Sequence, residues 1–391
     1  MKLKPIALLA AMALGASLAM AQKATPTQGV SKNEIVIGSI QDLSGPIAAF
    51  GKQVRFGMQL RVDELNEQSG GIHGRKIKLL IEDSQYDPKK AVLAAQKLVN
   101  QDKVFAMVAH VGTTNNLATM PILFERNVPN IYPITASRQM FEPFHKLKFA
   151  PGPSYFDQMR VYVPQLAKEK GSKKVCSITQ DDDFGAEVAE GAEAGLKTIN
   201  MTLAEKTTYK TGATDFSSQV ARMKGAGCDM VVMGTIIRET LGTIGEARKT
   251  GFSPVFIGSS AVYTDLNHKL ARGTTEGLYA AMTVQNPYLD DASQPLRFWA
   301  NKYQTKFNEE ATVFSVYGYQ AIETVITAAQ KAGPNLTSDS FIKAMETVNF
   351  PTDIFGAPEA IYGPKKRQAF DKSRLSQIQG GKWKVISDYN K

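Results

Sequence analysis

The sequence Ile35-Val36-Ile37-Gly38-Ser39-Ile40 is a short, almost continuous apolar run, and Ile77-Lys78-Leu79-Leu80-Ile81 is a second one. Between them, apolar residues recur at i, i+4 and i+7, which predicts a helix over residues 50–67 that stops at Gly70-Gly71. A strand, a helix and a second strand in this order predict two parallel strands joined by a right-handed crossover.

The same alternation continues beyond this unit. Further strands are expected at residues 104–108, 175–179, 230–233 and 255–257, and helices at 88–99 (with Asp87 as N-cap) and from 215, where apolar residues recur at helical spacing. The alternation falls into two runs, 34–148 and 149–277, with Ala150-Pro151-Gly152-Pro153 between them. Helical patterns at 295–307, 316–331 and 338–346 follow, and we expect this tail to cover the two lobes already built. The fold class is therefore α/β, with open, mostly parallel, doubly wound sheets.

The amino-terminal 21 residues predict a signal peptide. Two lysines precede an apolar stretch too short to cross a bilayer, and Ala19-Met20-Ala21 fits a cleavage site, so the mature chain would begin near Gln22 in the periplasm. No cysteine follows the apolar stretch, which argues against a lipid anchor.

Composition narrows the function classes. The 391 residues carry 46 basic and 37 acidic side chains, a net charge of +9, and 43% are hydrophobic, which indicates a globular protein. The basic residues are dispersed, so no nucleic-acid partner is expected; the cluster Lys365-Lys366-Arg367 is interpreted as a solvated loop.

Catalytic and metal-binding signatures are missing from the mature sequence. It has no phosphate-binding loop, zinc-protease motif or nucleophile elbow. Gly258-Ser259-Ser260 comes near the nucleophile elbow but lacks its second glycine. The run Asp181-Asp182-Asp183 lacks the spacing of a calcium loop. Of the four histidines only His110 falls at the end of a predicted strand, where pockets of such sheets form. We therefore expect no enzyme activity, no metal and no cofactor.

Two loops that follow predicted strands are rich in hydroxyl groups. The first is Gly112-Thr113-Thr114-Asn115-Asn116 and the second is Ile134-Thr135-Ala136-Ser137-Arg138. Ordinary helix capping would explain one Ser or Thr in each. Because ligands of open α/β sheets bind beyond the carboxyl ends of the strands, the paired hydroxyls favour a site for a ligand carboxylate.

Several motifs in the first lobe carry a family resemblance. Gly38-Ser39-Ile40-Gln41-Asp42-Leu43-Ser44-Gly45-Pro46, Gly70-Gly71-Ile72-His73-Gly74-Arg75 and Tyr86-Asp87-Pro88-Lys89-Lys90-Ala91 resemble the leucine/isoleucine/valine-binding family of periplasmic solute-binding proteins. The resemblance covers essentially the whole mature chain. It implies two lobes joined by three crossovers, which we place at 33–148 plus 279–354 and at 149–278 plus 355–391.

The resemblance also implies which residues bind the ligand in the cleft. The first lobe would supply a carboxylate-binding hydroxyl loop and an aromatic wall, and the second lobe an aromatic residue and further pocket residues. By position these are Phe50, Thr113, Thr114, Ile134, Thr135, Ser137, Phe184, Ile236 and Ser260.

One departure from the family pattern bears on the ligand. Amino-acid binders place a glutamate, which pairs with the ligand ammonium, where this sequence has Ser260. A buried ammonium without a carboxylate partner is costly, so a simple α-amino acid would need another acidic partner. The candidates are Asp182, Asp183, Glu239 and Asp265, and the candidate cations for a carboxylate are Arg138 and Arg238.

The family resemblance predicts a monomeric periplasmic component of an ABC importer that binds a branched-chain amino acid or a related aromatic or aliphatic acid and delivers it to a membrane permease. The alternatives are a sensory module that acts with a separate receptor and, less favoured, an exported hydrolase. Both cysteines, Cys176 and Cys228, fall in the second lobe, and whether they form a disulfide stays open at this point.

Overall fold

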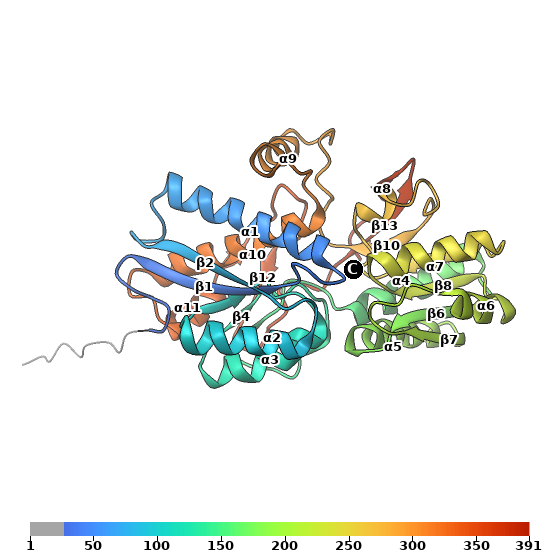
Figure 1. Cartoon of the computed structure of the whole chain (residues 1–391), viewed down its shortest axis with the longest axis horizontal. Coiled ribbons are helices and arrows are strands. Elements are labelled where there is room, and N and C mark those ends of the chain that lie inside the picture. The colour runs from blue at the N-terminus through green and yellow to red at the C-terminus, as the bar shows by residue number, and fades with distance from the viewer. Residues whose placement is uncertain (1–26, 391) are drawn as a thin grey trace, which may run out of the picture.

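The computed structural model describes residues 27–390, so the predicted signal peptide, residues 1–21, lies outside the described residues. Figure 1 shows two α/β lobes side by side, the first built around β1 and β2 and the second around β6 and β8. Among the helices of residues 27–390, none combines the length and apolar character that crossing a membrane requires.

The first lobe contains a five-stranded parallel sheet with the order β2-β1-β3-β4-β5. Its strands are β1 (Glu34–Gln41), β2 (Lys76–Asp83), β3 (Ala106–Val108), β4 (Asn130–Ile131) and β5 (Lys148–Phe149). The helices are α1 (Ala48–Gln68), α2 (Pro88–Gln96), which continues as a π-helical turn (Lys97–Gln101), and α3 (Thr113–Glu125). Asp87 accepts hydrogen bonds from the Lys89 and Lys90 amides, which confirms the predicted cap of α2.

The second lobe contains a seven-stranded sheet with the order β14-β13-β10-β9-β8-β6-β7. Its strands are β6 (Val175–Gln180), β7 (Leu203–Tyr209), β8 (Met230–Gly234), β9 (Val255–Gly258), β10 (Tyr279–Met282), β13 (Arg374–Gln379) and β14 (Lys382–Val385). The helices are α4 (Tyr155–Lys170), α5 (Asp183–Lys197), α6 (Ser217–Gly225), α7 (Ile237–Lys249) and α8 (Leu266–Lys269). The five parallel strands repeat the order of the first sheet, and β13 and β14 extend the sheet in antiparallel fashion.

The chain passes between the two sheets three times. It crosses after β5, after β10, and again after the small ribbon of β11 (Asn349–Phe350) and β12 (Ala360–Ile361). Because β10 pairs with β9 and β13, the second crossing follows Met282, whereas the sequence assigned residues 279–282 to the first lobe. Elsewhere the division into lobes stays a prediction.

The carboxyl-terminal helices return to the first lobe, as expected. They are α9 (Gln294–Phe307), α10 (Val313–Ala332) and α11 (Ser338–Met345). Helix α10 packs against α1, and glycines make the close approach possible: a Cβ at Gly57 would lie 1.9 Å from the Ser315 carbonyl oxygen, and one at Gly318 would lie 2.2 Å from that of Val54. This packing buries Phe314 against the start of α1.

All six strands predicted as apolar runs are confirmed. Strand β10 was missed although it is such a run, and the other missed strands lack one. Strands β4 and β5 have two residues each, and β7 alternates between exposed and buried positions because it is an edge strand. A search for continuous apolar runs cannot find either kind.

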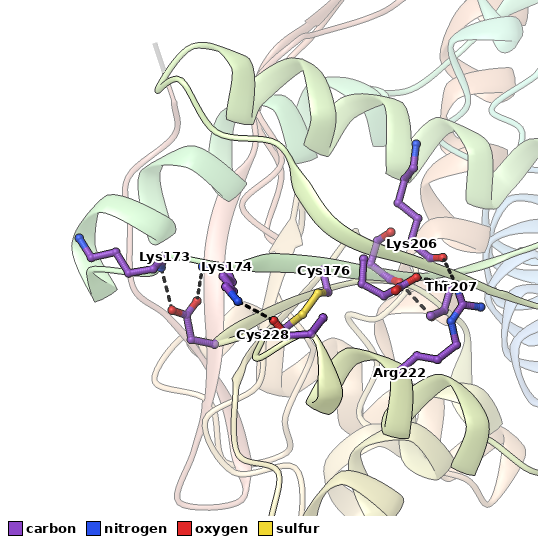
Figure 2. The surroundings of a disulfide bond; sticks show 11 residues. Lys173, Lys174, Cys176, Lys206, Thr207, Arg222 and Cys228 are labelled. Atoms are coloured by element: carbon purple, nitrogen blue, oxygen red, sulfur yellow. Dashed lines mark hydrogen bonds and ion pairs between the residues drawn. A yellow bond between two sulfur atoms is a disulfide. The ribbon is translucent and has the colours of Figure 1, made fainter.

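A disulfide joins Cys176 and Cys228, with their Cα atoms 6.0 Å apart. Figure 2 shows that it links β6 to the segment that leads into β8. The same segment is held by Asp229, which accepts hydrogen bonds from the Lys173 and Lys174 amides. The sequence left open whether the two cysteines form a disulfide, and the structure shows that they do.

The interpretation of Lys365-Lys366-Arg367 as a solvated loop is wrong for its last residue. The Arg367 side chain is 1% exposed, donates to Glu346 at 2.6 Å, and lies over the rings of Phe144 and Phe149. Lys365 and Lys366 are exposed as expected. The neighbouring backbone pairs with Ala150, so Arg367 fixes the third crossing against the first.

Candidate functional site

A cavity of about 100 Å³ lies between the two lobes. In both sheets the strand order reverses at one point, between β1 and β3 and between β6 and β8, and the loops that follow these strands meet at the cavity. Such switch points are where open α/β sheets bind ligands. The lining of the cavity includes residues of both lobes and of all three crossings.

The loop after β1 is organised by Asp42, which is fully buried. Its carboxylate accepts the backbone amides of Ser44 at 3.2 Å and Ile47 at 2.8 Å, which turns the chain into α1 and places Ile47 and Phe50 on the cavity wall. In the second lobe Asp182 caps the start of α5, because its carboxylate accepts the Gly185 amide at 3.1 Å. This cap lies next to Phe184 in the sequence.

One end of the cavity is a group of hydroxyls. The side chains of Thr113 and Thr135 are hydrogen bonded at 2.6 Å, and Tyr155 from the other lobe lines the cavity with them. The Tyr155 amide also donates to the Ala136 carbonyl at 2.6 Å, which ties α4 to the first lobe. The three hydroxyls form an array that a carboxylate can enter as acceptor.

The same end faces the amino terminus of α3. The first amide bound within the helix is that of Asn116, which donates to the Gly112 carbonyl, so the Thr113, Thr114 and Asn115 amides precede the internal hydrogen bonds. Gly112 has φ +92°, and a Cβ there would lie 2.8 Å from the Tyr86 ring, so the turn requires glycine. Free amides at a helix start attract anions.

The walls of the cavity are aromatic. Phe50 and Phe314 stack with their ring centroids 3.7 Å apart, and Tyr155 meets Phe184 edge to face at 5.0 Å. Eight aromatic residues line the cavity: Phe50, Tyr86, Tyr132, Tyr155, Phe184, Phe314, Tyr317 and Phe370. Such walls suit a flat apolar group.

Two of these aromatic residues occupy the left-handed backbone region. Tyr86 has φ 58° and Tyr132 has φ 52°, which is unfavourable for a bulky side chain. The Tyr132 hydroxyl donates to Gln320 of α10 at 2.7 Å, which holds one of the two rings against the first lobe. Two of the lining tyrosines are therefore held in an unfavourable backbone conformation.

Ser260 lies where the family resemblance led us to expect a glutamate. The side-chain amide of Gln158 on α4 binds it twice, because its oxygen accepts the Ser260 amide at 2.8 Å and its nitrogen lies 3.1 Å from the Ser260 hydroxyl. The same nitrogen also donates to the Pro153 carbonyl at 2.9 Å. This corner of the cavity is therefore neutral, and the hydrogen bonds of the Gln158 amide are used within the protein.

None of the cavity-lining residues in the described part of the chain has a charged side chain. Burial, and after it the nearby carboxylate of Asp182, raise the pKa of Tyr86 well above the usual range. Asp182 already accepts Gly185, Gln180 and, at 3.4 Å, Thr114. Burial raises the pKa of Glu239, which favours its uncharged form.

Neither candidate cation lines the cavity. The Nε atom of Arg138 lies 2.9 Å from Glu187, and the same guanidinium also contacts Glu190, so Arg138 binds α5 rather than a ligand. Arg238 is exposed and lines a separate, more open groove next to the loop at residues 44–46. The remaining acidic candidates, Asp183 and Asp265, are also absent from the cavity lining.

His110 does not line the cavity either. It is fully buried beside Thr119, and burial lowers its pKa to about 3, so the ring is neutral at physiological pH. Within residues 27–390, no group of three or more His, Cys, Asp or Glu is arranged to bind a metal.

Eight of the nine residues that the sequence nominated line the cavity: Phe50, Thr113, Ile134, Thr135, Ser137, Phe184, Ile236 and Ser260. Thr114 does not, because its side chain points to Asp182 across the cleft. That any of these residues contacts a ligand stays a prediction.

Sequence reasoning missed Tyr155, Gln158, Phe314 and Tyr317, which lie within helices and have no local signal. Tyr86, also missed, stood in a quoted motif.

A family model described as periplasmic binding protein matches residues 34–382. The Leu/Ile/Val-binding protein homolog 3 of Brucella melitensis is 27% identical over 80% of this chain and 83% of its own.

Two solved structures share the fold at low identity. A branched-chain amino acid ABC transporter protein from Thermus thermophilus with bound valine has a TM-score of 0.83 at 17% identity, over 92% of this chain and 97% of its own. A solute-binding protein from R. palustris in complex with benzoate has a TM-score of 0.80 at 18% identity, over 90% of this chain and 96% of its own. These likenesses show the expected two-lobed α/β fold.

Proposed function

The chain belongs to the periplasmic binding protein family, whose members are non-enzymatic substrate-binding proteins, and from this premise we propose that it is the solute-binding component of an ABC importer. It captures a small carboxylate in the periplasm, closes around it, and presents the closed form to a membrane permease. The ligand is a branched-chain amino acid or a related aromatic or aliphatic acid. Of the two solved structures that share the fold, one has bound valine and the other is in complex with benzoate.

The observation that carries this proposal is the cavity between the lobes. Thr113 and Thr135 come from the first lobe, and Tyr155 and Phe184 come from the second, so a ligand that touches all four would hold the lobes together. A ligand that binds only the closed form shifts the population toward that form. Capture and closure would thus be one event.

Binding is tested on the mature chain from Gln22 onward, freed of bound solute by unfolding and refolding. A ligand at 100 times its dissociation constant should stabilise the protein by about 2.7 kcal/mol, which a thermal-shift screen of amino acids and organic acids detects. Phe184→Ala, which opens one wall, should abolish the shift. If no carboxylate binds the refolded wild type, the proposal is wrong.

A sensory role is the second candidate, because the same capture could report to a separate receptor. Uptake of the labelled ligand, measured in cells with and without the gene, distinguishes an import role from a sensory role. Import requires that uptake falls when the gene is deleted, whereas a sensor would leave uptake unchanged and alter a cellular response.

A further inference from the structure

Resting on the proposed function, we infer that the ligand is a monocarboxylate with an aromatic or similarly apolar body and no ammonium group. The Gln158–Ser260 pair is the feature that rejects amino acids. The inference starts from the charge balance of the cavity. Hydroxyls and helix amides gather at one end, aromatic rings form the walls, and none of the lining side chains within residues 27–390 carries a charge.

An α-amino acid brings two opposite charges close together. Its carboxylate would bind the hydroxyl end at Thr113, Thr135 and Tyr155, which places its ammonium within a few ångströms of that end. An ammonium that leaves water needs a carboxylate or several free acceptors around it. The described residues of the cavity wall offer no carboxylate to this group.

The acceptors nearest to the ammonium position are already used. The Gln158 oxygen accepts the Ser260 amide at 2.8 Å, and the Gln158 nitrogen donates to the Pro153 carbonyl, so the pair presents no free carboxylate. Asp182 is occupied by the Gly185 amide and the Gln180 side chain, and Glu239 lies outside the lining with a pKa raised by burial. Neither of these acids lines the cavity.

A carboxylate, in contrast, finds donors without needing a cation. The α3 amino terminus offers the amides of Thr113 to Asn115, and the hydroxyls of Thr113, Thr135 and Tyr155 can donate to the same group. The apolar body would then lie among Phe50, Phe314 and Phe184, whose rings are 2%, 5% and 3% exposed. A flat ring gains stacking contacts there that a branched alkyl chain lacks.

The test compares matched pairs that differ only in the amino group: 3-phenylpropanoate with phenylalanine, and 4-methylpentanoate with leucine. Benzoate and its uncharged analogue benzamide are added, and affinities are measured by titration calorimetry on the refolded wild type. We expect each amino-free acid to bind at least about 100-fold more tightly than its amino acid. Benzamide should bind far more weakly than benzoate, because it lacks the charge that the helix amides favour.

A variant tests the neutral pair directly. Ser260→Glu restores a carboxylate at this corner and should move the preference at least about tenfold toward the amino acid in each pair. Thr211→Glu is the matched control, since it adds the same charge to an exposed position of the second lobe outside the cavity and should leave the preference unchanged. The wild-type comparison decides the question even if Ser260→Glu fails to fold.

The outcomes separate this inference from the proposed function. Tight binding of leucine or phenylalanine, with weak binding of the amino-free acids, would overturn the inference and leave the solute-binding role intact. If none of the acids and amino acids binds the refolded protein, both are wrong.

Discussion

Arg138 of the first lobe and Glu187 of the second are bound across the cleft, with Nε and Oε1 2.9 Å apart. The same guanidinium contacts Glu190 and lies 3.9 Å above the ring of Phe156. Glu187 is 7% exposed at its side chain, whereas Arg138 is 30% exposed, so the pair is only partly accessible to solvent. Opening the lobes would break all of these contacts, so they favour the closed form.

We therefore expect Arg138→Met to speed ligand release. The methionine keeps the contact with Phe156 and removes the ion pairs, and a partly exposed pair contributes up to about 1 kcal/mol, or about fivefold in the dissociation rate. Stopped-flow displacement of the ligand found in the thermal-shift screen measures this rate. Arg160→Met is the control, because it removes an ion pair inside α4 that does not cross the cleft. Equal rates in both variants would contradict this role of Arg138.

Thr113 and Thr114 are neighbours in sequence but face different partners, so their valine variants should differ. Thr113→Val removes a hydroxyl of the carboxylate end and should weaken binding of an acid by about tenfold or more. Thr114→Val loses only a 3.4 Å contact with Asp182 and should change affinity less than threefold, within about 0.5 kcal/mol. Calorimetry on both variants makes the comparison. Equal losses would show that Thr114 also contacts the ligand.

The disulfide should stabilise the second lobe considerably. It closes a loop with a sequence separation of 52, for which restriction of the unfolded chain predicts about 3–4 kcal/mol. The double variant Cys176→Ala/Cys228→Ala should therefore melt several degrees below the wild type, and a reducing agent should lower the melting temperature of the wild type alone. Ligand affinity should stay the same, since neither cysteine lines the cavity. A reductant-insensitive wild type would contradict the stabilising role.

The neutral His110 should make the protein less stable in acid. Its pKa is about 3 in the folded protein because of burial, against 6.5 for an unperturbed histidine. Between these values the unfolded chain binds a proton that the folded protein does not, so the stability contribution falls as the pH drops below 6.5. His110→Phe removes this titration and should show a flatter pH dependence.

Urea unfolding at pH 7.5, 6 and 4.5 measures the His110 effect as the difference in unfolding free energy between variant and wild type. The difference should move in favour of the variant as the pH falls. A difference that is constant with pH would show that His110 does not titrate as its burial predicts.

Much of the architecture was predictable from the sequence because the signals are local. Apolar runs identified six strands, the Asp87 cap identified the start of α2, and the hydroxyl loops after β3 and β4 identified most of one end of the cavity. Each depends on a few consecutive residues whose preferences hold in any context. The family motifs added Phe50, Phe184, Ile236 and Ser260 by position, and all four line the cavity.

Only the tertiary structure decided what surrounds those residues. Gln158 meets Ser260 across a sequence separation of 102, and Arg367, which looked like a surface residue, is buried against Glu346. The stacking of Phe314 on Phe50 depends on two glycines that let α10 approach α1. The charge of a cavity is a property of side chains brought together from distant segments. The sequence by itself therefore determined the family and most of the residues that line one cavity, whereas the folded chain decided that the cavity lining is neutral.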